Sequence, residues 1–180
     1  ALLQVAHNYE EQGMKILLVK PTIDTKGEDT VVSRIGLSRQ VDISLPDYYL
    51  LSSMLNSDDL PNAIIVDEAQ FLHPEQVDDL YLITKTLNVP VLCYGLRCDF
   101  QMKGFPGATR LLEIADDIEE MKTICKCGSK ATQNMRLLNG EPTFDGDQVL
   151  IDGSQDNITY KAVCGKCYVL QRSKLKKVSM

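Results

Sequence analysis

Two adjacent carboxylates, Asp67 and Glu68, directly follow the apolar run Ala63–Val66. Four consecutive apolar residues are typical of a strand that is buried on both faces inside a parallel sheet. Ligands bind outside the carboxyl ends of such strands, which is where this pair falls. A buried strand that ends in Asp is the Walker-B arrangement of nucleoside-triphosphate enzymes, where the Asp holds Mg²⁺. The pair therefore predicts a phosphate-transfer site, although a strand that simply ends in solvated acidic residues gives the same short pattern.

Four cysteines form two close pairs in the C-terminal third of the chain: Cys125 with Cys127, and Cys164 with Cys167. Two short turns that each supply two thiolates can surround Zn²⁺ tetrahedrally, and a closed site with four protein ligands is structural. Such a site can contribute on the order of 10 kcal/mol to the folding of a small lobe. The first pair has C-x-C spacing, tighter than the usual C-x-x-C of the second, and two unrelated pairs of reduced thiols are the alternative.

The bulk composition limits the classes of protein to which the chain can belong. Its 180 residues are 44% hydrophobic, enough for one domain plus a small module. The net charge of −6 and pI near 4.9 argue against nucleic-acid binding, which uses basic surfaces. We find no apolar run long enough to span a bilayer and no signal peptide, so we expect a cytoplasmic protein without a membrane partner. Cys93 and Cys98 are interpreted as core or near-core thiols.

Helix and strand patterns alternate through the first two thirds of the chain. The alternation predicts βαβ units and a parallel sheet. Residues 22–46 are polar and carry no strong pattern. The expected elements are a helix that ends before Gly13, a strand over Ile16–Val19, a helix over Asp47–Leu55, a helix opened by His73-Pro74-Glu75 and a strand over Val89–Tyr94.

The character of the chain changes near Ile124, after which turn signals and cysteine pairs replace long helical patterns. We therefore expect an α/β nucleotide-binding domain over residues 1–123 and a zinc-binding lobe over residues 124–180. The turn signals are Asn139-Gly140, Asp145-Gly146 and Asp152-Gly153. A basic tail is interpreted as a solvated, frayed terminus; it comprises Arg172, Lys174, Lys176 and Lys177.

An ordered set of motifs resembles the type II (thymidine kinase 1-like) family over nearly the whole chain. The motifs are Asp67-Glu68-Ala69-Gln70-Phe71, Tyr94-Gly95-Leu96-Arg97, Asp99-Phe100-Gln101 and the cysteine lobe. The resemblance implies a P-loop NTPase (RecA-like) α/β fold, with a parallel sheet, helices and a small C-terminal zinc-ribbon lobe. That lobe would carry a loop, or lasso, around the substrate.

The implied activity is transfer of the ATP γ-phosphate to the 5′-hydroxyl of thymidine, giving dTMP for DNA precursor synthesis. In this resemblance Glu68 is the general base and Asp67 orients Mg²⁺. Gln70 and Arg97 are expected on the side of the nucleotide cofactor. Arg97 could face the phosphates, and an ion pair with Asp99 or Glu68 is the alternative.

The resemblance also implies which residues enclose thymidine. They are Leu96, Phe100, Phe105, Val149, Ile151 and Tyr160. Tyr160 stands four residues before Cys164, as in the family. For Phe100 and Phe105, ordinary packing is the alternative interpretation.

Three departures from the family pattern affect this interpretation, and one of them is the C-x-C spacing of Cys125 and Cys127. The chain contains no G-x-x-x-x-G-K-[ST] loop, which would cradle the ATP phosphates. We therefore expect the natural molecule to extend N-terminally with a strand and that loop; an intact mass of 20.1 kDa would contradict this. In the lasso, Asp152 stands where the family's V-x-I-G-G pattern has Gly, followed by a longer run before Tyr160.

The resemblance further implies a homotetramer, a structural Zn²⁺ and feedback inhibition by dTTP. Two other functions remain open from the sequence. One is a non-catalytic α/β domain whose zinc ribbon binds protein or nucleic acid, and the other is a kinase for a different deoxynucleoside.

Overall fold

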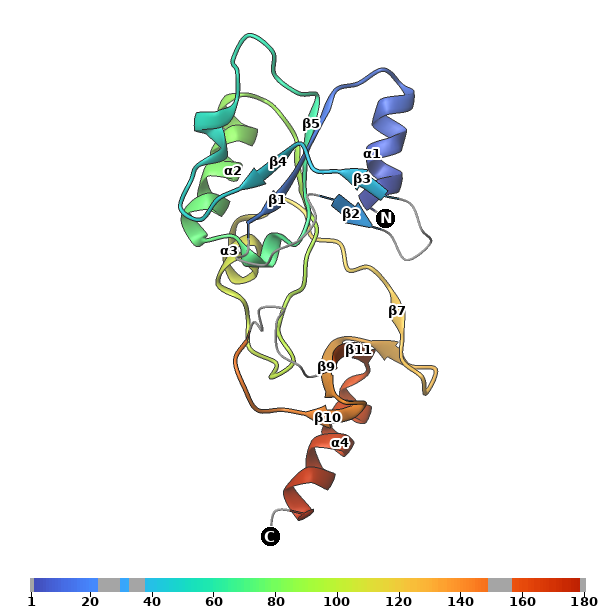
Figure 1. Cartoon of the computed structure of the whole chain (residues 1–180). Coiled ribbons are helices and arrows are strands. Elements are labelled where there is room, and N and C mark those ends of the chain that lie inside the picture. The colour runs from blue at the N-terminus through green and yellow to red at the C-terminus, as the bar shows by residue number, and fades with distance from the viewer. Residues whose placement is uncertain (1, 23–29, 33–37, 149–156, 179–180) are drawn as a thin grey trace. The chain divides into compact units, whose positions relative to one another are not determined.

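The computed structural model describes residues 2–22, 30–32, 38–148 and 157–178. It divides into two compact units, coloured along the chain in Figure 1. We call residues 1–97 with 105–116 the α/β unit, and residues 98–104 with 117–180 the cysteine unit. The described part of the chain contains four α-helices, and none of them is both long enough and apolar enough to cross a membrane.

The α/β unit is built on a four-stranded parallel sheet with the strand order β4-β1-β5-β6. A two-stranded antiparallel ribbon, β2-β3, accompanies it. The elements in chain order are α1 (Leu2–Glu11), β1 (Ile16–Pro21), β2 (Thr30–Val32), β3 (Ser38–Gln40), β4 (Ile43–Leu45), the 3₁₀ helix η1 (Leu51–Met54), β5 (Ala63–Val66), the 3₁₀ helix η2 (Ala69–Phe71), α2 (Pro74–Thr86), β6 (Val91–Cys93) and α3 (Pro106–Ile114).

Strand β5 lies inside the sheet, and all four of its residues are fully buried. Successive side chains of a strand point to opposite faces, so each face receives two of them. Ala63 and Ile65 pack in the cluster that contains the apolar side of α1. Ile64 and Val66 pack in the cluster that contains α2. The helices therefore cover both faces of the sheet, as Figure 1 shows, and the expected two-sided burial of this strand is confirmed.

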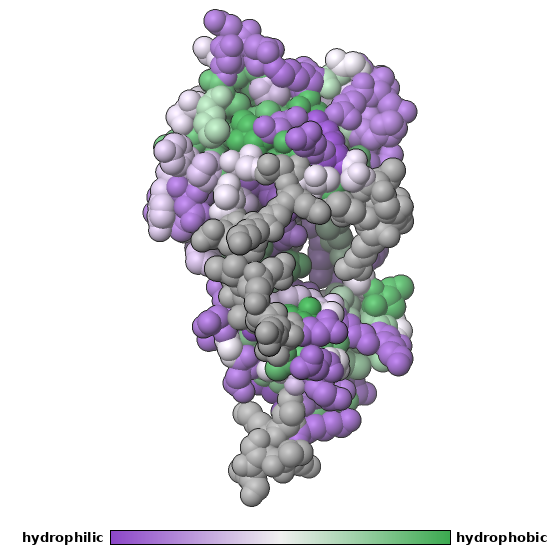
Figure 2. Space-filling model, in the orientation of Figure 1, coloured by the Kyte–Doolittle hydropathy of each residue, from purple (hydrophilic) through white to green (hydrophobic). Residues whose placement is uncertain are grey.

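Two of the three helices expected around the central strands, α1 and α2, are present, and the end of α1 follows from its sequence. After α1, Gly13 adopts φ +69°, a left-handed conformation that glycine takes at little cost. Gly13 N–H then bonds the carbonyl of Glu10, and Met14 N–H bonds that of Tyr9, which closes a Schellman motif. Hydrophilic side chains cover the outer side of α1 in Figure 2.

The helix expected over Asp47–Leu55 is wrong. Tyr48 adopts φ +63°, which an α-helix does not accommodate, and only the short η1 forms. The carboxylate of Asp79 on α2 holds η1 by accepting hydrogen bonds from the backbone N–H and the hydroxyl of Ser52. Upstream, the segment that showed no pattern contains β4, which pairs in parallel with β1.

Helix α3 was not expected from the sequence, because a Pro-Gly pair normally marks a turn. Here the pair opens the helix, with Pro106 in its first turn. Gly107 lies against the backbone of η2: a Cβ added at this position would come within 2.3 Å of the Leu72 carbonyl oxygen. The glycine is therefore required by a close approach of two backbones rather than by a turn.

The cysteine unit contains a three-stranded antiparallel sheet with the order β10-β9-β11 and a separate pair, β7-β8. Asn139 and Gly140 connect β9 to β10, both with positive φ, as a two-residue hairpin turn requires. The expected turn at this dipeptide is thus confirmed. The elements are β7 (Thr123–Ile124), β8 (Lys130–Ala131), β9 (Gln133–Leu138), β10 (Glu141–Thr143), β11 (Ile158–Val163) and α4 (Gly165–Val178).

The interpretation of the basic tail as a frayed terminus is wrong for residues 165–178, which form α4. The helix is anchored near its start by Tyr168, which is 1% exposed. The Tyr168 hydroxyl donates a hydrogen bond to the Phe100 carbonyl oxygen at 2.6 Å, and its ring meets that of Phe144 edge to face. A buried anchor in the first turn explains why a basic sequence continues as a helix here.

Candidate active site and cysteine centre

Asp67 and Glu68 lie at the carboxyl end of β5, where the sequence places them. Asp67 continues the sheet, because its N–H bonds the Val19 carbonyl oxygen on β1 at 2.9 Å. Glu68 then turns the chain: it adopts φ 50° and ψ 36°, an uncommon left-handed conformation for a residue with a side chain. The turn starts η2, so the two carboxylates leave the strand at a sharp bend rather than along a straight extension.

The Glu68 carboxylate is held by the side chain of Gln70. Gln70 Nε2 donates a hydrogen bond to Glu68 Oε2 at 2.5 Å, and its Oε1 accepts one from the Leu96 N–H at 3.0 Å. Gln70 is 1% exposed, so both ends of its amide are satisfied within the protein. Gly95 leaves room for this amide, since an added Cβ would lie 2.5 Å from Gln70 Oε1. The structure therefore places Gln70 beside Glu68, in contact with the end of β6 as well.

The environment of Asp67 disfavours its negative charge. Burial raises the pKa of the Asp67 carboxyl and the charge of Glu68 raises it further, whereas a hydrogen bond from the Glu68 backbone and the charge of Lys20 oppose this rise to a smaller extent. A divalent cation bound here would relieve both effects, and carboxylate oxygens are the ligands that Mg²⁺ takes in proteins. The donor set at the end of β5 thus fits a hard divalent cation.

Arg97 follows β6 and is exposed. In the described part of the chain no carboxylate, neither Asp99 nor Glu68, forms an ion pair with it. The ion-pair alternative for Arg97 is therefore not found in this structure.

The residues expected to enclose thymidine fall in both units. In the α/β unit, Leu96 is 44% exposed, whereas Phe105 is buried and meets Phe71 edge to face at 5.4 Å between ring centroids. In the cysteine unit, Phe100 is 1% exposed and Tyr160 is 56% exposed. Both phenylalanines are packed within protein, as the packing alternative has it. Val149 and Ile151 lie outside the described residues.

A functional candidate that the sequence analysis missed is Arg136 on β9, which is 2% exposed. Its guanidinium carbon lies 3.5 Å from the centroid of the Phe100 ring, and its Nε donates a hydrogen bond to the Tyr160 hydroxyl at 3.0 Å. It thus touches two of the expected substrate residues. The available signal was a cation between the apolar residues Met135 and Leu137, where burial of a charge calls for an explanation.

The four paired cysteines come together in the cysteine unit. Their Sγ atoms all lie within 4.8 Å of one another, and those of Cys127 and Cys164 are 3.6 Å apart. The tighter C-x-C pair is accommodated by a turn in which Gly128 has φ +86°, so the short spacing does not prevent convergence. Four sulfurs at these separations suit tetrahedral Zn²⁺.

The protonation of these thiols also suits a metal. Hydrogen bonds from the side chain and backbone of Ser129 lower the pKa of Cys127 to about 6. The other three thiols, with Cys127 contributing most, raise the pKa of Cys167 to about 12. The four sulfurs therefore cannot all ionise side by side without a cation, which is the charge balance that Zn²⁺ supplies.

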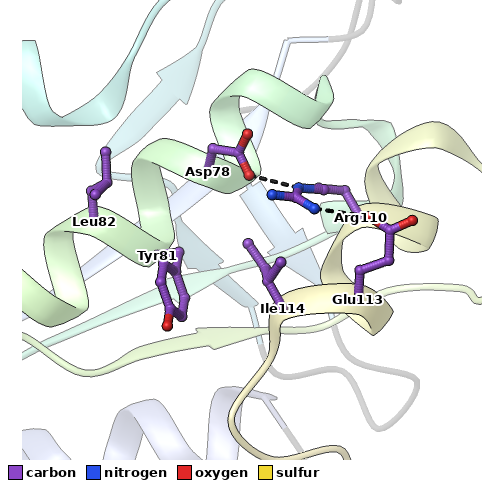
Figure 3. A pocket seen from close by; sticks show the side chains of 6 residues that line it. All are labelled: Asp78, Tyr81, Leu82, Arg110, Glu113 and Ile114. Carbon is purple, nitrogen blue, oxygen red and sulfur yellow. Dashed lines mark hydrogen bonds and ion pairs between the residues drawn. The ribbon is translucent and has the colours of Figure 1, made fainter.

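A surface hollow lies elsewhere on the α/β unit, between α2 and α3 (Figure 3). Arg110 spans it by binding Asp78 Oδ1 at 2.6 Å and Glu113 Oε2 at 2.9 Å. Tyr81, Leu82 and Ile114 complete its lining. It contains none of the residues expected for catalysis, so we do not assign the reaction to it.

Comparison with known proteins identifies the family. The sequence model of the thymidine kinase family matches residues 1–168. The chain belongs to the thymidine kinase family. The thymidine kinase of Streptococcus pyogenes serotype M3 is 41% identical over 169 residues, which cover 93% of this chain and 88% of the relative. The thymidine kinase of Streptococcus agalactiae serotype Ia is 43% identical with the same coverage.

Membership of the thymidine kinase family confirms the resemblance found from the sequence. The match includes both the Asp67–Glu68 pair and all four paired cysteines, since it runs through residue 168. A non-catalytic α/β domain with a zinc ribbon is not favoured, because the relatives that cover most of this chain are named as kinases.

Proposed function

We propose that this protein transfers the γ-phosphate of ATP to the 5′-hydroxyl of thymidine, producing dTMP. The observation that carries the proposal is the pair Asp67–Glu68 at the carboxyl end of the buried strand β5, in a chain of the thymidine kinase family. Phosphoryl transfer requires positioning, charge neutralisation and a carboxylate at the nucleophile. This end of the sheet offers carboxylates for the last two tasks.

Glu68 acts in this proposal as the general base that accepts the proton of the 5′-hydroxyl. The hydrogen bond from Gln70 fixes one carboxylate oxygen and leaves the other to face the substrate. Asp67 would hold Mg²⁺, which would supply positive charge to neutralise the phosphates. Gln70, which we expected on the cofactor side, contributes by holding Glu68, and the exposed Arg97 is available to the phosphates.

The residues proposed to contact thymidine are those expected from the sequence. Leu96 and Phe105 come from the α/β unit, and Phe100 and Tyr160 from the cysteine unit, together with Val149 and Ile151 of the lasso. We also propose the division of labour expected from the sequence, in which residues 1–123 bind the nucleotide and residues 124–180 supply the zinc lobe and the lasso. Zn²⁺ on the four cysteines is structural, because all four of its positions are filled by protein.

Three further properties belong to the proposal through the family resemblance. The protein forms a homotetramer, is inhibited by dTTP and works in the cytoplasm. Gel filtration with light scattering tests the first, and inhibition kinetics with dTTP test the second.

The deciding experiment measures ATP- and Mg²⁺-dependent phosphorylation of thymidine by the natural full-length protein. Uridine and deoxycytidine serve as control substrates, and an assay without Mg²⁺ serves as the metal control. We expect dTMP to form from thymidine and much less product from either control. Preferential turnover of another deoxynucleoside would change the substrate assignment, and no turnover of any of them would overturn the kinase proposal.

A further inference from the structure

The buried guanidinium of Arg136 binds both chain segments that border residues 149–156. On one side its Nη2 donates hydrogen bonds to the carbonyl oxygens of Asp147 at 2.8 Å and Gln148 at 3.2 Å. On the other side its Nε donates to the Tyr160 hydroxyl at 3.0 Å. Residues 147 and 148 precede the stretch 149–156 of the lasso expected from the sequence, and Tyr160, another expected lasso residue, follows that stretch. One side chain therefore ties its two flanks together.

The sheet places Arg136 where it can do this. It lies on the middle strand β9, directly opposite Thr143 of β10 and Tyr160 of β11. Opposite residues on neighbouring antiparallel strands hold their side chains close together. The guanidinium also covers the ring of Phe100 at 3.5 Å from its centroid, a cation–π contact that keeps the planar fork in one orientation.

Two side chains of the Asp99-Phe100-Gln101 motif also bind the segment that precedes residues 149–156. Asp99 Oδ2 accepts a hydrogen bond from Gln148 Nε2 at 3.0 Å, while its Oδ1 caps the turn at the N–H groups of Gln101 and Lys103. Gln101 Nε2 donates to the carbonyl oxygens of Phe144 at 3.2 Å and Gly146 at 3.0 Å. The motif therefore holds residues 144–148 at several points.

The charge of Arg136 points to a geometric purpose. Among the residues described in the cysteine unit, no carboxylate forms an ion pair with it, so its partners are carbonyls, a hydroxyl and an aromatic face. Burial of a cation without a counter-charge is costly, and an apolar residue of similar size commonly serves stability as well or better. An apolar residue, however, could not bind two carbonyls and a hydroxyl at fixed angles.

We propose that Arg136 is a positioning residue for thymidine: it fixes the Tyr160 hydroxyl and residues 147–148, so that the two flanks of the lasso are set before the nucleoside binds. The inference rests on the proposed thymidine kinase activity. It assigns Arg136 to nucleoside affinity rather than to the chemical step, because its partners among the described residues include Tyr160 and Phe100, which are expected to contact thymidine. The Tyr160 hydroxyl and residues 147–148 are then already held in place when thymidine arrives, which lowers the entropic cost of binding.

The test compares Arg136→Met, Arg136→Lys and Tyr160→Phe with the natural protein in steady-state kinetics. Arg136→Met removes three hydrogen bonds, and we expect the KM for thymidine to rise about tenfold or more, with kcat and the KM for ATP within about twofold. Arg136→Lys retains the charge but loses the planar guanidinium fork, so we expect its KM for thymidine to lie between those of the natural protein and Arg136→Met. Lys161→Met, which removes a neighbouring exposed cation on β11, is the matched control and should leave all three constants unchanged.

The double variant Arg136→Met with Tyr160→Phe tests whether the two residues act together. If they do, the double variant raises the KM for thymidine by a factor much smaller than the product of the factors for the two single variants. Zinc content and thermal unfolding of each variant establish that the lobe is folded, and Arg136→Lys and Tyr160→Phe carry the test if Arg136→Met does not fold. An unchanged KM for thymidine in folded Arg136 variants, or an equal rise in the KM for ATP, would overturn the inference. An inactive natural protein would instead overturn the proposed function on which it rests.

Discussion

The amide of Gln70 joins the carboxylate of Glu68 to the backbone of Leu96, in the segment that follows β6. Gln70 Nε2 donates to Glu68 Oε2 at 2.5 Å, and Gln70 Oε1 accepts from the Leu96 N–H at 3.0 Å. The proposed general base and a proposed thymidine contact are therefore connected through one buried side chain. An amide that is hydrogen-bonded at both ends has a single favourable orientation, which fixes the direction of the Glu68 carboxylate before substrate binds.

Replacement of Glu68 by Gln should abolish most of the activity without unfolding the protein. The new amide has nearly the same shape and can still accept a hydrogen bond from Gln70, but it cannot accept the proton of the 5′-hydroxyl. A positioned base contributes about 10² to 10⁴ in rate, so kcat should fall at least about a hundredfold. Steady-state assays with thymidine, together with thermal unfolding, measure both effects. A purified variant with near-normal kcat would remove Glu68 from this role.

Replacement of Gly95 by Ala should displace the proposed general base Glu68 indirectly, through Gln70. The added Cβ would lie 2.5 Å from Gln70 Oε1, 3.1 Å from the backbone nitrogen of Gln70 and 3.3 Å from the backbone nitrogen of Ala69. The Gln70 side chain must then move, which releases its hold on Glu68. Because small misplacements of catalytic groups cost up to about a hundredfold, we expect kcat to fall about tenfold or more. Zinc content is the internal control, since the cysteine centre should be unaffected; normal kcat in the alanine variant would refute the proposed role of Gln70.

The catalytic strand was the easiest part of the structure to predict from the sequence. Ala63–Val66 is apolar throughout and is followed directly by charge, so local pattern and tertiary burial agree. The four-cysteine site was equally easy to predict, because closely spaced cysteine pairs in a chain of this kind most often bind a metal. In both cases the chemistry lies in consecutive or nearly consecutive residues.

Elements fixed by contacts distant in sequence could not be predicted. Strand β4 is only three residues long and is defined by pairing with β1. The false helix over Asp47–Leu55 has helical composition, but Asp79 on α2 binds Ser52 and holds a 3₁₀ turn instead. Glycine disfavours helices, yet Gly107 lies inside α3, because the backbone at η2 approaches too closely for any side chain at this position. Arg136 likewise shows its partners only once the three strands are assembled.

Replacement of Asp67 by Asn should remove activity and raise stability at neutral pH. Burial and the charge of Glu68 raise the pKa of Asp67, so the folded protein binds its proton more tightly than the unfolded chain does. Ionisation of Asp67 therefore destabilises the fold above its raised pKa, and this penalty disappears as the pH falls below the unfolded value near 3.8. We expect the Tm of the variant to exceed that of the natural protein at pH 7 to 8, by a margin that shrinks toward pH 4.

Magnesium provides the control for that prediction. The ion should raise the Tm of the natural protein by binding the folded state, and should raise that of Asp67→Asn much less. Thermal unfolding across pH, with and without Mg²⁺, measures both margins. A variant that is less stable than the natural protein at pH 7.5 in the absence of Mg²⁺ would contradict the electrostatic account of this site.

Replacement of Cys127 by Ser should release zinc and unfold the cysteine unit. The four sulfurs lie within 4.8 Å of one another, and loss of one leaves an incomplete tetrahedral site. Because a structural zinc can contribute on the order of 10 kcal/mol to folding, we expect loss of the metal, exposure of the lobe to protease and loss of thymidine turnover. Cys93→Ala is the matched control: burial raises the pKa of Cys93 to about 12, so this thiol stays neutral, and its replacement should leave the zinc content at one per chain.

Acidification should have the same effect on the natural protein as the substitution. Zinc binds thiolates, so protons compete with it and the metal should dissociate as the pH falls. The pKa of Cys127 is lowered to about 6, so this thiol ionises readily near neutral pH, whereas the pKa of Cys167 is raised to about 12, so a bound cation must favour its ionisation. Zinc bound per chain, measured by a colorimetric chelator between pH 8 and pH 4, should fall together with the protease resistance of the lobe. Full zinc content in Cys127→Ser, with the lobe intact, would exclude Cys127 as a ligand.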